Sequence, residues 1–157
     1  MFLRTIIFFT FFLPTLLVAQ WVPQISHTEA HFRAISAINE KTIWAGGSKG
    51  TVLRTTTGGK NWAVLQVPGA EKLDFRGIKG LDEKTAVAVS AGLAEEGQAR
   101  IYRTDDAGKT WTQVWQTNQK CVFLDGIAFW DKKNGLIFGD PIDGHLYLLK
   151  TTDGGKT

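Results

Sequence analysis

The sequence predicts an all-β chain that forms an incomplete β-propeller of four-stranded antiparallel blades. One observation is a short string, rich in Thr, Gly and Trp, that occurs three times at a spacing near fifty residues, which is typical of propeller blades rather than helical repeats. The second is composition: six Trp, ten Phe and 17 Gly among 157 residues favour strands joined by tight turns. With 43% hydrophobic and 21% charged residues, the chain is not disordered.

The first twenty residues differ in kind from the rest. "MFLR" supplies a positive start, an apolar run follows, and Ala19 is a small residue at a plausible cleavage site. The run is short and Pro14 interrupts it, so it makes a poor membrane span. We therefore expect a signal peptide over residues 1–20, with an uncleaved anchor as the alternative. After cleavage we expect no stable membrane span and an exported chain, periplasmic or extracellular.

Each repeat opens with two short apolar strands separated by a polar turn. "FRAISAINEKTIWAGG" at 32–47 aligns with "FRGIKGLDEKTAVAVS" at 75–90 and with "LDGIAFWDKKNGLIFG" at 124–139. Stretches such as "AVAV" are apolar on both faces, as blades packed between neighbours require. A third strand follows ("TVLRT", "RIYRT" or "LYLLKT"), then the repeated string, then a fourth strand ("WAVLQV" or "WTQVWQ"). The predicted blades span about 32–67, 75–116 and 124–157.

The repeated string, Thr-x-Asp-x-Gly-x-Thr-Trp, has the chemistry of a hairpin turn. The Asp accepts backbone N–H groups, the Gly permits positive φ, and the Trp buries its ring against the turn and the adjacent blade. In the first copy Thr57 stands in the Asp position and Asn61 in that of the second Thr, so we expect a weaker turn there. The predicted structural residues are Thr55, Gly59, Trp62, Thr104, Asp106, Gly108, Thr110, Trp111, Thr151, Asp153, Gly155 and Thr157.

The stretch "WVPQ" at 21–24 matches the starts of the fourth strands. We expect residues 21–25 to be an orphan outer strand, of the kind that completes the last blade of a ring. Two full blades, most of a third and one strand are fewer than the four blades that a closed ring needs. The sequence therefore favours an N-terminal fragment of a longer propeller. A short protein that closes by self-association is the alternative.

The repeated string resembles the Asp-box, or BNR repeat, of sialidases and of the photosystem II stability and assembly factor family. "ARIYRTDDAGKTW" and "FLDGIAFWDKKNGLIFGDPIDG" are more similar to the second group, and the resemblance covers residues 21–157. It implies an exported, non-catalytic propeller that binds another protein and assists its assembly or stability. It does not imply a photosystem partner. The alternative is a sialidase-type glycoside hydrolase or a glycan-binding propeller.

Functional residues are expected on the rim opposite the repeated turns, around the mouth of the central channel. Arg33 and Arg76 occupy matching positions at the starts of innermost strands, and Asp125 holds that position in the third blade. The arginines predict either a carboxylate-binding ring or, as the more ordinary interpretation, pairing with a neighbouring blade. The acidic loop "GDPIDGH" predicts a turn more readily than a cation site. The candidate binding residues are Arg33, Arg76, Asp125, Asp140, Asp143 and His145.

Other function classes lack their signatures. The net charge of +3 forms no basic stripe, so we expect no nucleic acid partner. No Gly-rich phosphate loop or metal-ligand spacing is present, so no cofactor or metal is expected. Tyr102 aligns with core positions and Tyr147 is predicted to lie far from the channel, so neither suits a sialidase nucleophile and enzyme activity is disfavoured. Cys121 is the sole cysteine, which excludes an internal disulfide.

Overall fold

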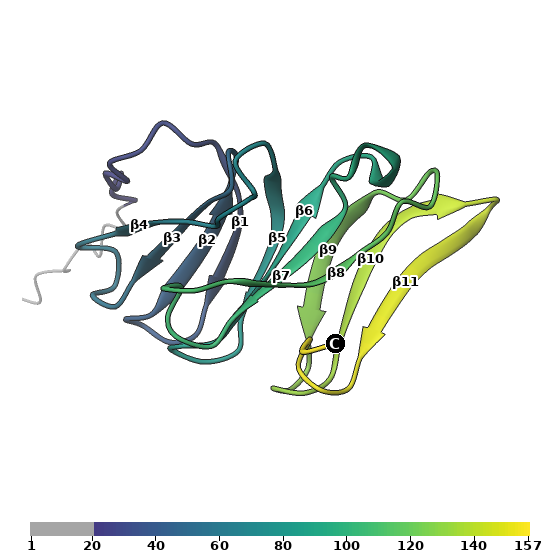
Figure 1. Cartoon of the computed structure of the whole chain (residues 1–157). Helices are drawn as coiled ribbons and strands as arrows, with labels where there is room; N and C mark the ends of the chain where they lie inside the picture. Colours follow the sequence, from purple (N-terminus) through teal and green to yellow (C-terminus); the bar gives the residue numbers. More distant parts are fainter. Residues whose placement is uncertain (1–20) are drawn as a thin grey trace, which may run out of the picture.

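The computed structural model describes residues 21–157, and these form three antiparallel sheets that lie side by side (Figure 1). The predicted all-β fold is confirmed. The expected signal peptide lies outside the described residues. Between residues 21 and 157 no helix is long and apolar enough to cross a membrane.

The strands follow one another across each sheet in chain order. Blade 1 consists of β1 (Phe32–Ala37), β2 (Ile43–Gly47), β3 (Thr51–Thr55) and β4 (Ala63–Gln66). Blade 2 consists of β5 (Asp74–Gly80), β6 (Ala86–Ala91), β7 (Arg100–Thr104) and β8 (Thr112–Gln116), with the short 3-10 helix η1 (Ala94–Glu96) between β6 and β7. Blade 3 consists of β9 (Leu124–Phe129), β10 (Gly135–Ile142) and β11 (His145–Thr151). Because β1 contacts β5 and β5 contacts β9, the first strand of each blade lies innermost.

The turn between the first and second strand is built in the same way in every blade. The side-chain oxygen of Asn39 accepts the N–H groups of the residues two and three positions later, at 2.9 and 2.8 Å. Asp82 does the same at 3.0 and 2.9 Å, and Asp131 at 2.7 and 2.8 Å. An Asx side chain thus replaces backbone partners in each turn, as its residue type predicts.

The core lies between the blades. Trp44, Phe75 and Tyr102 are buried between blades 1 and 2, and Val89 and Leu124 are buried between blades 2 and 3. Every residue of β6 is buried, because this strand has a neighbouring blade on both faces. Each fully buried large apolar side chain stabilises the fold by roughly 1.5–3 kcal/mol, so blade stacking supplies most of the packing energy.

Arginine side chains of the third strands connect adjacent blades. Arg54 of blade 1 stacks on Trp44, with 5.2 Å from its Cζ to the ring centroid. The same guanidinium donates to the carbonyl of Glu83 in blade 2 from Nε at 3.1 Å and from Nη2 at 2.6 Å. Arg103 holds the equivalent position in blade 2 and donates to the carbonyl of Gly154 in blade 3. Each arginine therefore fixes how its blade sits against the next one.

Two segments differ from the sequence-based expectation. Residues 21–25 form no strand within the described part of the chain; Gln24 lies instead beside the turn glycine Gly59 of blade 1. In blade 3, β10 and β11 extend into the expected acidic loop, which shrinks to Asp143 and Gly144. Both turn residues have positive φ, 51° and 78°, which is the backbone conformation of a tight two-residue hairpin and explains the Asp-Gly pair.

We predict that Gly108→Ala destabilises the fold more than Gly69→Ala does. Both glycines have positive φ, 85° and 77°, so each substitution carries the backbone cost of about 1–2 kcal/mol. A Cβ at Gly108 would lie only 2.5 Å from Leu65 Cδ1, whereas a Cβ at Gly69 meets no atom within 4 Å. The overpacking at Gly108 should add roughly 1–3 kcal/mol, measured as the difference in the free energy of unfolding in urea. Equal losses in the two variants would contradict the close blade contact described here.

Candidate binding site on the upper rim

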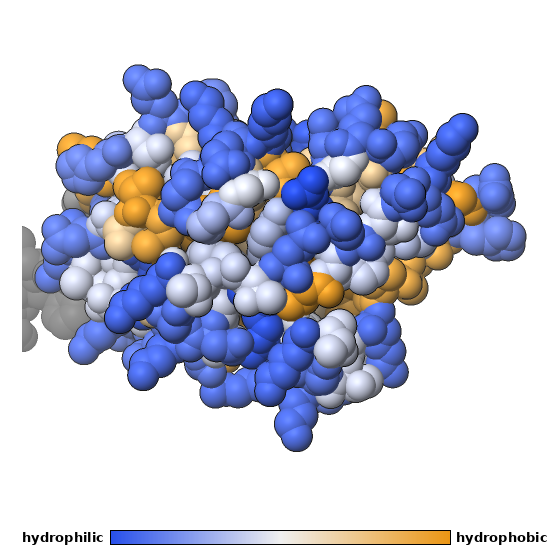
Figure 2. Space-filling view, viewed as in Figure 1, coloured by the Kyte–Doolittle hydropathy of each residue, from blue (hydrophilic) through white to orange (hydrophobic). Residues whose placement is uncertain are grey.

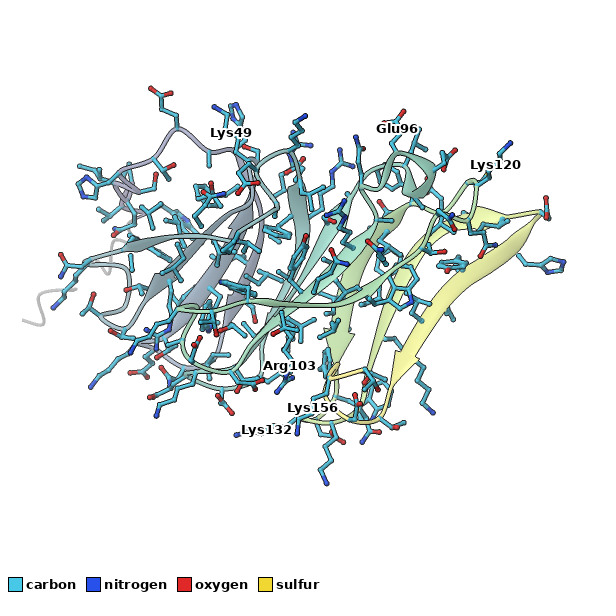
Figure 3. All side chains as sticks on the ribbon, in the orientation of Figure 1. Lys49, Glu96, Arg103, Lys120, Lys132 and Lys156 are labelled. Atoms are coloured by element: carbon cyan, nitrogen blue, oxygen red, sulfur yellow. The ribbon has the colours of Figure 1, made fainter. Side chains whose placement is uncertain are left out.

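The three repeated strings all lie at the lower rim, which is the end of the sheets that carries Arg103, Lys132 and Lys156 in Figure 3. In each string the hydroxyl of the first Thr accepts the N–H of the glycine four residues later. The distances are 3.1 Å for Thr55, 3.0 Å for Thr104 and 2.9 Å for Thr151. The Thr at the end of the third strand therefore closes each turn.

The Asp in the second and third strings adds further bonds. Asp106 accepts the N–H of Thr110 at 2.9 Å and its hydroxyl at 2.7 Å. Asp153 accepts the N–H of Lys156 at 3.0 Å and the hydroxyl of Thr157 at 2.7 Å. These hydrogen bonds stabilise the carboxylates and lower their pKa values, that of Asp106 to about 2.

In the first string Thr57 takes the place of the Asp. Its hydroxyl accepts the N–H of Asn61 at 3.0 Å, but it brings no negative charge and only one side-chain oxygen. The turn therefore lacks the charge-assisted hydrogen bonds of the other two copies. The identification of all three strings as Asp-boxes stays a prediction from sequence.

The second Trp of the repeat, Trp111, packs against the preceding blade. Its ring meets Trp44 edge to face, with 6.4 Å between the centroids and 86° between the planes. Trp62 is half-buried beside Gly59 in blade 1. The lower rim is therefore a structural rim, occupied by its own turns and rings.

Five charged side chains lie near one another at the upper rim, where β1, β5 and β9 begin and where Figure 3 labels Lys49, Glu96 and Lys120. We call this set the charge row. It consists of Arg33, Asp74, Arg76, Asp125 and Asp140. Three blades contribute to it, so the row crosses both blade interfaces.

Asp74 lies between the two arginines of the charge row. Its Oδ2 is 3.4 Å from Nε of Arg33 and 3.7 Å from Nε of Arg76, so one carboxylate oxygen holds arginines of two blades. Its other oxygen, Oδ1, is buried and has no hydrogen-bond partner in the described part of the chain. The contacts are long and single, so they are weaker than a bidentate pair.

Both arginines keep donors available. The Arg33 side chain is 48% exposed and that of Arg76 39% exposed. Within residues 21–157 neither guanidinium donates a hydrogen bond that meets ordinary geometry. Arg76 also lies over the ring of Phe123, with 5.4 Å from its Cζ to the ring centroid. This cation–π contact orients the guanidinium group. The arrangement can bind an anionic group from outside.

At the blade 3 end of the charge row, Asp125 and Asp140 lie close enough to interact. Burial raises the pKa of the Asp125 carboxyl, the charge of Asp140 raises it further, and Arg76 opposes both. Asp143 lies in the exposed hairpin turn between β10 and β11, and His145 is the exposed first residue of β11. No group of three His, Cys, Asp or Glu side chains able to hold a metal occurs in residues 21–157.

Sequence reasoning singled out the two arginines but missed Asp74, which joins them. The position two residues before the arginine in the repeat is His31 in blade 1, Asp74 in blade 2 and Phe123 in blade 3. The only signal for Asp74 in the sequence was that this position differs from blade to blade. An alignment of repeats emphasises the residues that all copies share, and an Asp stands at this position only in blade 2. Phe123, the ring beneath Arg76, was missed for the same reason.

Comparison with solved structures places this architecture among propellers. The chain is similar to YCF48 bound to a D1 peptide, with a TM-score of 0.64 and 20% identity over 83% of this chain. It is also similar to YCF48 from Cyanidioschyzon merolae, with a TM-score of 0.61, 22% identity and the same coverage. A GH74 enzyme from Niastella koreensis gives a TM-score of 0.61 at 14% identity over 80% of this chain.

These likenesses define the fold, a partial β-propeller, and they include both YCF48 and GH74 enzymes. The chain spans 40% of each of the two YCF48 structures and 22% of the GH74 structure. No family model and no curated protein matches the sequence.

We predict that the stability lost in acid depends partly on Asp106. Its pKa is lowered from 3.8 to about 2 in the folded chain, so its contribution is complete above pH 4 and is lost as the pH falls towards 2. Asp106→Asn removes that contribution, so the difference in free energy of unfolding between wild type and variant should shrink over this pH window. Urea titrations at pH 6, 4, 3 and 2 would measure it.

Asp143→Asn is the matched control, because this carboxylate lies at the opposite rim and accepts no hydrogen bond in the described part of the chain. It should leave the pH dependence unchanged. A wild type and an Asp106→Asn variant that lose stability in parallel would show that the turn does not bind its carboxylate as described.

Proposed function

We propose that this chain forms part of an exported, non-catalytic propeller that binds another protein through the charge row of its upper rim. The observation that carries the proposal is the pair of exposed guanidinium groups of Arg33 and Arg76, held in place by one shared carboxylate. A carboxylate of a partner would make bidentate hydrogen bonds to either fork, which are stronger than the single contacts that Asp74 makes. Arginine is also well suited to protein interfaces.

The role that fits is that of a scaffold for assembly or stability of the bound protein. A propeller of this fold, YCF48, has been solved with a bound D1 peptide, which supports peptide binding as a use of such a fold. The apolar first twenty residues of the sequence support the exported location. The identity of the partner is left to experiment.

Glycoside hydrolysis is the rival function, since GH74 enzymes share the fold. In the described residues Tyr102 is buried in the core, where its hydroxyl contacts Gln113 at 3.3 Å. Tyr147 packs against the core between blades 2 and 3. Neither offers the exposed nucleophile of sialidase chemistry, and this disfavours a sialidase-type hydrolase.

We predict that Arg33→Ala with Arg76→Ala abolishes capture of a stoichiometric protein partner. The full-length protein would be immobilised and exposed to the exported protein fraction of its host. Lys120→Ala is the matched control: it removes a positive charge from the same rim outside the charge row, and capture should persist. Arg33→Lys with Arg76→Lys keeps the charges but removes the forks, and affinity should fall at least tenfold.

Loss of capture in the control would show that net charge alone drives binding and would contradict the proposal. A panel of fluorogenic glycosides tests the rival function in parallel. Sugar release by the wild type that disappears in Arg33→Ala would establish a hydrolase and overturn the scaffold.

A further inference from the structure

The innermost strand of every blade contains a β-bulge at the same position of the repeat. In β1 the residues on either side of Arg33 pair with two adjacent residues of β2, so Arg33 is an extra residue without a cross-strand partner. Arg76 of β5 and Asp125 of β9 are extra in the same way. The bulge therefore belongs to the repeat, although the residue that it carries changes between blades 2 and 3.

A β-bulge changes the direction of the extra side chain, and bulges are common beside functional sites. In all three blades the bulge residue is more exposed than the residue before it. In β5, for example, Phe75 is fully buried, whereas the Arg76 side chain is 39% exposed. The scaffold thus presents one side chain from each blade at the upper rim, where the innermost strands begin.

The three bulge residues differ in charge. Blades 1 and 2 present Arg33 and Arg76, and blade 3 presents Asp125. Figure 2 shows mainly hydrophilic side chains along the upper rim, so charge rather than an apolar pocket distinguishes one partner from another there. A like charge placed opposite any of the three lowers affinity, and discrimination between partners uses such repulsion as well as attraction. The order of the charges on the partner therefore matters.

Asp74 sets the spacing of the two arginines. Its Oδ2 lies 3.4 Å from Nε of Arg33 and 3.7 Å from Nε of Arg76, so the two Nε atoms are separated by no more than the sum of these distances. In an extended peptide every second side chain lies on the same face, with a spacing of about 6.6 Å. Two acidic side chains at alternate positions of an extended segment therefore match the two arginine forks.

Asp125 occupies the next position of the charge row. Arg76 reaches blade 3, because its guanidinium lies over the ring of Phe123, two residues before Asp125. Burial and the charge of Asp140 raise the pKa of the Asp125 carboxyl, and Arg76 opposes them. Two neighbouring carboxylates beside one guanidinium leave negative charge uncompensated, and an ammonium or guanidinium group of a partner would offset it.

We propose that Asp125 is a specificity-determining residue of the charge row, and that the bound segment is extended and carries two acidic side chains and then a basic one at alternate positions. This inference rests on the proposed function, because it assigns the charges of the partner that the charge row binds. The acidic side chains bind to Arg33 and Arg76. The basic side chain binds to Asp125, which repels an acidic side chain at that position.

Fluorescence anisotropy of labelled peptides with the full-length protein at low salt tests the order of charges. The first probe is Thr-Val-Glu-Thr-Glu-Thr-Lys-Val-Thr, and the second is its reverse, because the segment can run in either direction along the row. The third, Thr-Val-Glu-Thr-Lys-Thr-Glu-Val-Thr, has the same composition but places Lys opposite Arg76. The fourth has Glu in place of Lys.

We expect the first or the second probe to bind about threefold or more tightly than the third and the fourth, because each of these two exchanges an ion pair for a like-charge contact. The third probe has the same net charge as the first two, so a difference among them reports the order of charges alone. Equal affinity for the first three probes, or no binding of any probe, overturns the proposal.

Substitutions at Asp125 test its part directly. Asp125→Asn removes the charge and keeps the shape, so the advantage of the better lysine probe over the all-acidic one should disappear. Asp125→Arg should invert the preference about threefold or more. Glu95→Arg is the matched control, since it makes the same change of charge at an exposed position of the same rim outside the charge row, and the order of affinities should persist. An unchanged preference in Asp125→Asn overturns the proposal, and circular dichroism checks the fold of each variant.

The proposed function and this inference fail separately. Capture of a protein partner that is lost in the Arg33→Ala, Arg76→Ala double variant, together with equal affinity for the first three probes, supports the proposed function and overturns the inference. Capture that persists in the double variant, together with a probe preference that Asp125→Asn removes, contradicts the proposed function and supports the role of Asp125.

Discussion

Each sheet of this protein has apolar side chains on both faces, and the rest of the structure depends on covering those faces. In blade 2 both faces are covered, since β6 is buried along its whole length by a neighbouring blade on either side. Blades 1 and 3 each have a described neighbour on one face, and apolar residues such as Ile35 and Phe138 are exposed. The devices between blades serve this stacking: Trp111 fills the gap to the previous blade, and Arg54 and Arg103 tie each blade to the next.

Local chemistry explains why the strands and turns could be predicted from the sequence. The Asx turns at Asn39, Asp82 and Asp131 and the Thr–Gly closures of the repeated string involve residues within four positions of one another. Their signals therefore lie in short stretches of sequence, and the repeat displays each of them up to three times. The hairpin at Asp143 and Gly144 had an equally local signal in the Asp-Gly pair, but its acidic neighbours suggested a longer loop.

The candidate site was less predictable, because its geometry depends on how one blade is rotated against the next. The matching arginines Arg33 and Arg76 were visible as a repeated feature. The carboxylate that both approach, Asp74, belongs to one blade alone, and nothing in the sequence says that it meets an arginine 41 positions earlier, a separation that follows from the two residue numbers. The two interpretations of the arginines also prove compatible, since each contacts Asp74 and still exposes its fork.

The loops at the upper rim differ greatly in length from blade to blade. Blade 1 turns at residues 48–50 and blade 3 at 143–144, whereas blade 2 carries the longer loop 92–99 with η1. A rim with one tall segment beside two low ones has no rotational pseudo-symmetry, even though the strands beneath it repeat. An incoming molecule that lies along the charge row would therefore approach a different loop at each blade. Because the loops are unequal, the two directions along the rim differ in structure even though the strands repeat.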